Sequence, residues 1–334
     1  SWSDPVPLFS GRLVPEGRIR YAEPCCLFDE LSNRLLVVVY RALYPGDKLD
    51  VDCRYAPLLT SYDPESGRWS ELESLDLTPG RSLGVSFSFP IATAAGRIVV
   101  PALRQLLGAD GKPVHYRGCW APVDEPLSII AERDGPGRRA GGLSWRVGAP
   151  VPVDPERSSR GLDEHAILEL RDGSIVAVIR GDNSMFPERP GYKWVSFSRD
   201  GGERWSEPVP LGDTAGTPIE SGSSGSALFR SALDGAVYWI GNLCLRGERP
   251  TGNLPRTPLY VVKVREEPFA LERETAFAVD ERGYNDYEGI QFSNFRWYQD
   301  RGSGELVILM DRYCARGREQ WWRSDYYRYR VALA

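Results

Sequence analysis

The sequence lacks any apolar run long enough to cross a membrane. Its longest runs, such as LLVVVY at residues 35–40, fall far short of the roughly 20 residues that a spanning helix needs. No positively charged stretch followed by an apolar one precedes Trp2, so the sequence shows no export signal. We therefore expect no membrane insertion.

Histidines and clustered cysteines are also scarce. The chain has two histidines and six cysteines, and no two cysteines form a CxxC pair. Structural zinc sites and dense disulfide frameworks depend on such clusters. We therefore expect no metal, no cofactor and mostly buried free thiols. Free thiols favour a cytoplasmic location, although a secreted protein whose signal has been removed remains an alternative.

Charge of one sign does not dominate either. The 41 basic and 46 acidic residues are interspersed and give a net charge of -5. Nucleic-acid-binding proteins carry a basic face, so nucleic acid is not an expected partner. What the chain does have is apolar content, because 42% of its 334 residues are hydrophobic. That is enough for a sizeable core.

One pattern recurs five times along the chain. A small turn residue precedes a β-branched run in SNRLLVVVYR, AAGRIVVPALR, RDGSIVAVIR, LDGAVYWIGNL and GSGELVILMDR. Alignment on Asn33, Gly96, Gly173, Gly235 and Gly304 gives steps of 63, 77, 62 and 69 residues. A strand, a tight hairpin and a second strand in each copy, followed by further strands, are typical of propeller blades. The sequence therefore predicts an all-β fold, a five-bladed β-propeller.

The first residues repeat a segment from the middle of the chain. Residues 2–8, WSDPVPL, match residues 205–211, WSEPVPL, at all but one position. The fifth unit ends without such a segment, so we predict that an N-terminal strand closes the last blade and removes unpaired strand edges. The expected blades of this single domain are 9–75, 76–155, 156–212, 213–280, and 281–334 with 1–8.

A turn motif supports the propeller. SRDGGERW at 198–205 has the form Ser-x-Asp-x-Gly-x-x-Trp, an Asp-box, and SYDPESGRW at 61–69 is a degenerate copy. In such a turn we expect the Asp and Ser side chains to bond the loop backbone and the Trp to pack between strands. The motif indicates a fold and not a chemistry.

Candidate functional residues follow from propeller geometry, because the innermost strands meet at one mouth. Polar residues that suit a saccharide or an anion stand where these strands start or end, among them Glu23, Arg41, Glu164, His165, Arg180, Asp182, Asn183 and Tyr287. Each of them has an alternative interpretation as a solvated loop residue. Glu164 and Arg180 also have one as a structural ion pair.

The order of these residues resembles the bacterial exo-sialidases (neuraminidases) over roughly residues 84–312. GRIVVPA resembles a Gly-Arg hairpin that leads into a strand ending in Pro. LSWRVGAPVPV and GLDEHAILELRDGSIVAVIR resemble the Trp-x-x-Gly strand, the Asn-Glu motif and the Arg-ended strand of that family. NLPRTPLYVVKV and DYEGIQFSNF resemble the segments that carry a later arginine and the catalytic tyrosine.

The resemblance implies a role for several residues. Tyr287 is the nucleophile that Glu164 polarises, and Arg180 and Arg256 hold the substrate carboxylate. The general acid is Asp50, with Asp47 and Asp52 as equal alternatives. A tyrosine nucleophile avoids the repulsion between an anionic nucleophile and a carboxylated sugar. Arginine suits the carboxylate because its planar fork meets both oxygens.

The first blade departs from the family pattern. Where sialidases have Tyr-Arg-Ile-Pro, this chain has YAEP at 21–24, so Ala22 replaces an arginine. Sialidases also have six blades, which is the alternative to the five counted here.

The leading hypothesis is an exo-glycosidase that hydrolyses a terminal carboxylated sugar, sialic acid or a relative, by a retaining mechanism. The expected partner is therefore a glycan or monosaccharide that carries a carboxylate. Two alternatives stay open. One is a propeller polysaccharide lyase on uronate glycans that uses His165, Tyr287 and Arg180, and the other is a non-catalytic carbohydrate-binding propeller. The sequence indicates no oligomeric state.

Overall fold

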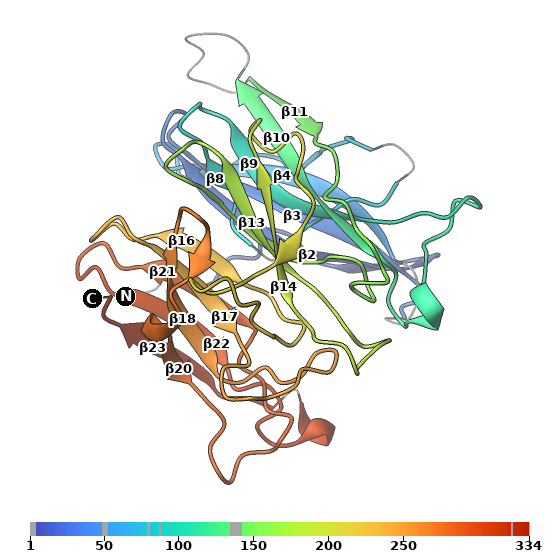
Figure 1. The fold of residues 1–334 in the computed structure, drawn as a ribbon. Coiled ribbons are helices and arrows are strands. Elements are labelled where there is room, and N and C mark those ends of the chain that lie inside the picture. The colour runs from blue at the N-terminus through green and yellow to red at the C-terminus, as the bar shows by residue number, and fades with distance from the viewer. Residues whose placement is uncertain are drawn as a thin grey trace.

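The computed structural model describes residues 5–48, 53–78, 81–86, 88–133, 142–321 and 323–333. These residues form five antiparallel β-sheets that follow one another in chain order (Figure 1). Their helical elements are three short 3-10 turns, Tyr116–Gly118, Arg273–Thr275 and Arg318–Gln320. None of these is long and apolar enough to cross a membrane. The predicted all-β fold and five-bladed propeller are confirmed, with five sheets and not six.

Each sheet corresponds to one copy of the sequence repeat. The first contains β1 (Arg12–Val14), β2 (Gly17–Asp29), β3 (Arg34–Pro45), β4 (Arg54–Asp63), β5 (Arg68–Trp69) and β6 (Glu73–Ser74). The second contains β7 (Gly84–Val85), β8 (Ile91–Ala92), β9 (Ile98–Gln105), β10 (Asp124–Arg133) and β11 (Leu143–Val147). The third contains β12 (His165–Glu169), β13 (Ile175–Arg180), β14 (Lys193–Ser198) and β15 (Val209–Pro210). The fourth contains β16 (Ala227–Arg230), β17 (Val237–Asn242), β18 (Leu259–Arg265), β19 (Ala270–Leu271) and β20 (Phe277–Asp280), and the fifth β21 (Phe295–Gln299), β22 (Leu306–Asp311) and β23 (Tyr326–Val331).

The small residues that mark the repeat form the hairpin turns. Asn33, Gly96, Gly173, Gly235 and Gly304 each lie between two paired strands, and each has a positive φ between 52° and 83°. Glycine and asparagine adopt this backbone conformation more readily than other residues. The turn chemistry therefore explains why the five copies fold alike.

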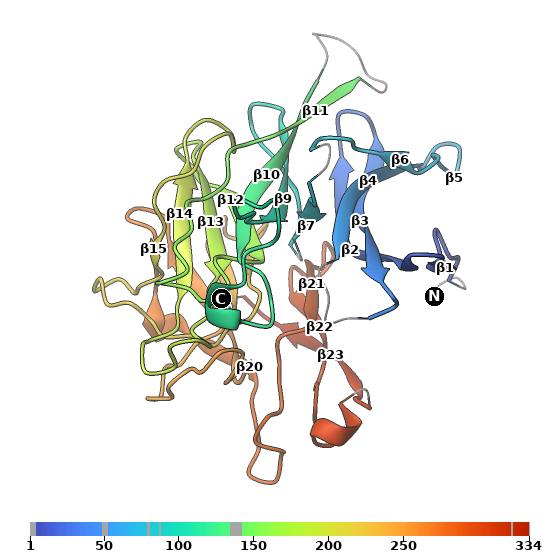
Figure 2. The same cartoon turned by 90° about the vertical axis from the view of Figure 1, so that its right-hand side faces the viewer.

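Buried apolar side chains fill four of the spaces between sheets. Representative pairs are Val38 with Leu127 between sheets one and two, Val99 with Ile179 between two and three, Val176 with Val262 between three and four, and Ile240 with Ile308 between four and five. In the described residues no comparable cluster joins the fifth sheet to the first, where Arg296 faces Glu23 at 3.8 Å. Figure 2 shows β2–β4, β9–β10 and β13–β14 as neighbouring sheets with β21–β23 below them.

The N-terminal segment does not close the last blade in the part of the chain that the structure describes. Pro5–Leu8 form no strand, and residues 1–4 lie outside the described ranges. The first strand, β1, folds back onto β2 in the first sheet, with Arg12 opposite Ile19. The fifth sheet has three strands there. The residues at which one blade gives way to the next stay predictions.

Candidate functional site

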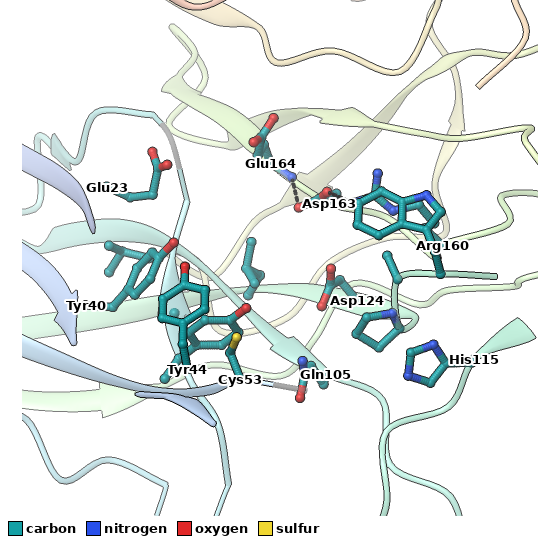
Figure 3. Close-up of a pocket in the computed structure, with 17 residues that line it drawn as sticks. Glu23, Tyr40, Tyr44, Cys53, Gln105, His115, Asp124, Arg160, Asp163 and Glu164 are labelled. Carbon is teal, nitrogen blue, oxygen red and sulfur yellow. Dashed lines mark hydrogen bonds and ion pairs between the residues drawn. The ribbon is translucent and has the colours of Figure 1, made fainter. Parts of the chain in front are cut away.

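A pocket of about 330 Å³ opens between the first two blades and the segment that leads into β12. Its lining residues are Glu23, Tyr40, Tyr44, Cys53, Tyr55, Gly84, Val85, Leu103, Gln105, His115, Trp120, Ala121, Pro122, Asp124, Arg160, Asp163 and Glu164. Figure 3 shows Glu23, Tyr40 and Tyr44 on one side, Asp124, Arg160 and His115 on the other, and Glu164 at one end. Carboxyl, phenol and aromatic groups therefore surround one space, as in many small-molecule binding sites.

The β12–β13 hairpin places Glu164 beside Arg180. Glu164 directly precedes β12, Arg180 ends β13, and the amide of Arg180 donates to the carbonyl of Glu164 at 3.0 Å. The guanidinium Nη1 of Arg180 then donates to Glu164 Oε2 at 2.9 Å. The hairpin thus brings two residues that are 16 positions apart in the sequence to the same end of the blade.

Two carboxyl groups at this end have opposite protonation preferences. Burial, with the charge of Asp163, raises the pKa of Asp124 well above its usual range. Burial also acts on Asp163, but Arg180 and Arg160 outweigh it and lower the pKa of Asp163. Arg160 Nη2 donates to Asp163 Oδ2 at 2.9 Å. Neighbouring carboxyl groups whose pKa values are shifted in opposite directions are typical of acid–base sites.

Arg180 and Arg256 share their hydrogen-bond acceptors. Both donate to Asn253 Oδ1, at 3.0 and 3.1 Å. Arg180 Nε donates to the hydroxyl of Ser223 at 2.8 Å, and Arg256 Nε donates to the carbonyl of the same residue at 2.9 Å. The two guanidinium groups, from the third and fourth blades, therefore lie next to each other.

The two arginines differ in how their charges are balanced. Arg180 pairs with Glu164 and lies 3.8 Å from Asp163, and these two carboxylates outweigh its burial and raise its pKa. Arg256 donates only to neutral oxygens, including those of Gln291 and Ser293, and among the described residues no carboxylate lies within 4.0 Å of it. Burial and the charge of Arg180 lower the pKa of Arg256 to about 10. Arg256 is therefore still a cation at neutral pH, and it has no carboxylate counter-ion within ion-pair distance among the described residues.

Buried residues behind the arginines hold the loops that carry their partners. Lys193 lies opposite Arg180 on β14, and its Nζ donates to the carbonyls of Gly222 and Ser224. Burial, followed by the charges of Arg180 and Arg256, lowers the pKa of Lys193 well below its usual range. The 222–224 loop fixed in this way supplies both Ser223 contacts.

The structure brings together some of the residues that the sequence predicts. Glu23 and Glu164 line the pocket, and Arg180 and Arg256 lie behind Glu164. Asn183 is 2% exposed, donates to two backbone carbonyls and accepts from the amide of Gly252, so its role is to support the segment that carries Asn253. Buried Asp182 accepts from the amide and hydroxyl of Ser184 and stabilises its own turn at residues 182–184.

Other predicted residues lie elsewhere. His165 is 1% exposed and does not line the pocket. Arg41 is exposed on β3, where it points away from the face that carries Tyr40 because successive side chains alternate. Tyr287 is 36% exposed in the loop before β21 and is not part of the lining.

The predicted acid falls on a part of the chain that the structure leaves out. Asp50 and its alternative Asp52 lie outside the described residues. The third alternative, Asp47, forms exposed ion pairs with Arg18 at 2.8 Å and Arg20 at 3.3 Å. This pairing gives Asp47 a structural partner away from the pocket.

Sequence reasoning missed most of the pocket wall. Tyr40, Tyr44, Tyr55, Asp124 and Arg160 were absent from its candidates. A signal for two of them exists, because Val38, Tyr40, Ala42 and Tyr44 alternate along RLLVVVYRALYP and must share one face of β3. Asp124 and Arg160 have no such pattern, since their position depends on a contact between the second and third blades.

Comparisons with known proteins agree with this fold. No family profile and no curated protein matches the sequence. Among solved structures, an intramolecular trans-sialidase from Ruminococcus gnavus is 15% identical, with a TM-score of 0.61 over 94% of this chain and 78% of that one. The NanB sialidase from Streptococcus pneumoniae is 13% identical, with a TM-score of 0.59 over 94% of this chain and 56% of that one. A Trypanosoma rangeli sialidase is 13% identical, with a TM-score of 0.56 over 93% of this chain and 45% of that one.

At this identity the likeness shows the fold alone. The chain shares the propeller arrangement of these sialidases. It spans about half the length of the last two.

Proposed function

We propose that this protein is an exo-glycosidase of the sialidase type that hydrolyses a terminal carboxylated sugar, sialic acid or a close relative. One observation carries the proposal, namely Arg256 without a carboxylate partner beside the paired Arg180. A partly buried guanidinium without a counter-ion is a ready site for an anion, and a sugar carboxylate offers two oxygens to its fork. The sialidase neighbours support a glycosidase at the level of the fold.

In this proposal the arginines orient the sugar and Glu164 acts as the base. Arg180 holds the Glu164 carboxylate at the pocket wall through the 2.9 Å hydrogen bond. The tyrosine is better assigned to Tyr40 than to Tyr287. Tyr40 lines the pocket and interacts electrostatically with Glu164 and Glu23. Burial, with these carboxylates, raises the pKa of Tyr40, so it needs a base such as Glu164 to become a nucleophile.

The test is hydrolysis of an aryl sialoside by purified wild-type protein and its variants. Arg256→Gln should raise KM about 10- to 100-fold, because the loss of a charge-assisted contact costs roughly 1.5–3 kcal/mol. Arg256→Lys keeps the positive charge but loses the planar fork of the guanidinium, so its KM should lie between those of the wild type and Arg256→Gln. The control is Arg34→Gln, whose side chain pairs with Asp63 on the outside of the first blade.

The same assay tests the tyrosine. Tyr40→Phe should abolish turnover while sialoside binding is kept, and Tyr287→Phe should leave turnover near the wild-type value. The reverse result would return the nucleophile to Tyr287. No hydrolysis by the wild type, with an ultraviolet-absorbing unsaturated product released from a uronate polymer, would favour a lyase instead.

A further inference from the structure

Glu23 lies at an irregularity in β2, which at 13 residues is the longest strand among the described residues. On β2, Ala22 pairs with Tyr40 and Cys25 with Val38, so two residues of β2, Glu23 and Pro24, face one residue of β3. This is a β-bulge, a feature that commonly redirects a side chain next to an active site. Glu23 has a φ of 52°, which is rare for a residue with a long side chain. Such strain persists where the surrounding structure enforces it, often at a functional site.

The bulge places the Glu23 carboxyl in the pocket lining, and among the described residues one of its oxygens has no hydrogen-bond donor. Its Oε2 atom is buried, and among the described residues nothing donates to it. Arg296 Nη2 of the fifth blade forms an ion pair with this oxygen at 3.8 Å, beyond hydrogen-bond distance. A buried carboxyl oxygen without a donor is costly as an anion. It is satisfied more cheaply as a neutral acid that can donate its own proton.

The electrostatic surroundings agree with a neutral acid. Burial is the main cause that raises the pKa of Glu23, and the negative charges of Glu164 and Asp163 raise it further. The positive charge of Arg296 lowers it, and the resulting pKa is about 7. The titratable and charged groups that act on Glu23 or respond to it are Glu164, Asp163, Arg296, Tyr40, Tyr44 and Cys25. Glu23 therefore exchanges its proton in the neutral range, where a general acid works best.

We propose that Glu23 is the proton donor to the leaving group in the glycosidase reaction, in the role that the family resemblance gives to an aspartate. This inference rests on the proposed function. It stands on the bulge, on the buried carboxyl oxygen that receives no hydrogen bond from the described residues, and on the position of Glu23 in the lining with Tyr40 and Glu164. Asp124 lines the same pocket but is a buried residue, whereas the Glu23 side chain is partly exposed.

These groups account for every proton transfer of the reaction. The Glu23 proton passes to the glycosidic oxygen as the bond to the anomeric carbon breaks, and the aglycone leaves as an alcohol. The tyrosine oxygen bonds to the anomeric carbon, and its proton passes to Glu164. In the second half, Glu23, now a carboxylate facing Arg296, takes a proton from the attacking water. The water oxygen bonds to the anomeric carbon as the carbon–tyrosine bond breaks, and Glu164 returns its proton to the tyrosine oxygen.

The test compares two leaving groups. An aryl sialoside releases an acidic phenol that needs little protonation, whereas the lactose of sialyllactose would leave as an alkoxide unless its glycosidic oxygen is protonated. Glu23→Gln keeps the size of the side chain and removes the acid. It should slow sialyllactose hydrolysis about 100-fold or more and aryl sialoside hydrolysis by less than about 10-fold, the range expected for general acid catalysis. The control is Glu125→Gln, which removes a carboxylate paired with Arg104 outside the pocket lining.

A second variant separates catalysis from structure. Arg296→Gln removes the cation that lowers the pKa of Glu23, so the alkaline limb of kcat/KM should move to higher pH, which a purely structural role would not produce. If Glu23→Gln slows both substrates equally, or if the alkaline limb does not move in Arg296→Gln, the assignment of Glu23 is wrong. The proposed function still stands in that case, provided that the wild type hydrolyses the substrates. A wild type inactive on both substrates overturns the proposed function, and this inference with it.

Discussion

His165 is a buried histidine held in its neutral form. Burial is the main cause that lowers its pKa to about 4, although the charge of Asp163 acts in the opposite direction. The unfolded chain protonates its histidines near pH 6.5. The folded state therefore binds fewer protons, and its stability is full above pH 6.5 and falls as the pH drops toward 4.

We predict that His165→Phe removes this acid sensitivity. Between pH 7 and pH 4 the free energy of unfolding of the wild type should fall about 3 kcal/mol further than that of the variant. Urea denaturation at several pH values measures the difference. His115→Phe is the control, since it leaves His165 in place and should keep the wild-type dependence. Parallel curves for wild type and His165→Phe would show that His165 does not set the acid limit.

At the residue level, the sequence predicts contacts within one hairpin better than contacts between blades. Glu164 and Arg180 could be paired because they flank the same turn at Gly173. Asn253, which joins Arg180 to Arg256, could not be foreseen, since it stands on a loop held by Asn183 from another blade. Glu23 was a candidate by position, but its bulge depends on the register between β2 and β3.

At the level of elements, the turn at residues 198–205 shows how local chemistry fixes a blade. The Ser198 hydroxyl donates to Asp200 and accepts from the amide of Gly202 at 2.8 Å, and Asp200 accepts from the amide of Arg204. Gly202 has a φ of 93° and packs against the second blade. The buried Trp205 fills the space between the two blades.

This turn offers a test of strain against packing. A Cβ at Gly202 would lie 3.1 Å from Ser128 Oγ and Val99 Cγ1, whereas one at Gly173, with a φ of 82°, would meet nothing within 4 Å. Both changes to alanine force an unfavourable backbone, worth about 1–2 kcal/mol. Gly202→Ala should lose roughly 1–3 kcal/mol more than Gly173→Ala because of overpacking. Chemical denaturation measures both, and equal losses would mean that the contact to the second blade relaxes freely.

At the level of the whole molecule, the candidate site exists only because several blades meet. Glu23 and Tyr40 come from the first blade, Arg180 from the third, and Arg256 from the fourth. The sequence repeat predicts how many sheets form, because each copy carries its own turn. It does not predict how the ring is completed, because this depends on which edges pair. The segment at residues 5–8 forms no strand, despite its likeness to residues 208–211.

The fifth blade should therefore be the least stable part of the ring. β23 and β14 are both third strands, and each pairs over six residues with its neighbour. Five of the six residues of β14 are buried, whereas none of those in β23 is. β15 also covers β14, and in the described residues no strand covers β23. Local opening depends on how much apolar surface it exposes.

Hydrogen exchange can test this difference. The amides of β23 should exchange at least about 100-fold faster than those of β14, which corresponds to an opening free energy lower by roughly 3 kcal/mol. Exchange followed by mass spectrometry at neutral pH resolves the two strands. If β23 were protected as well as β14, the fifth blade would open only with the whole ring, and its seam with the first blade would be as strong as the four apolar ones.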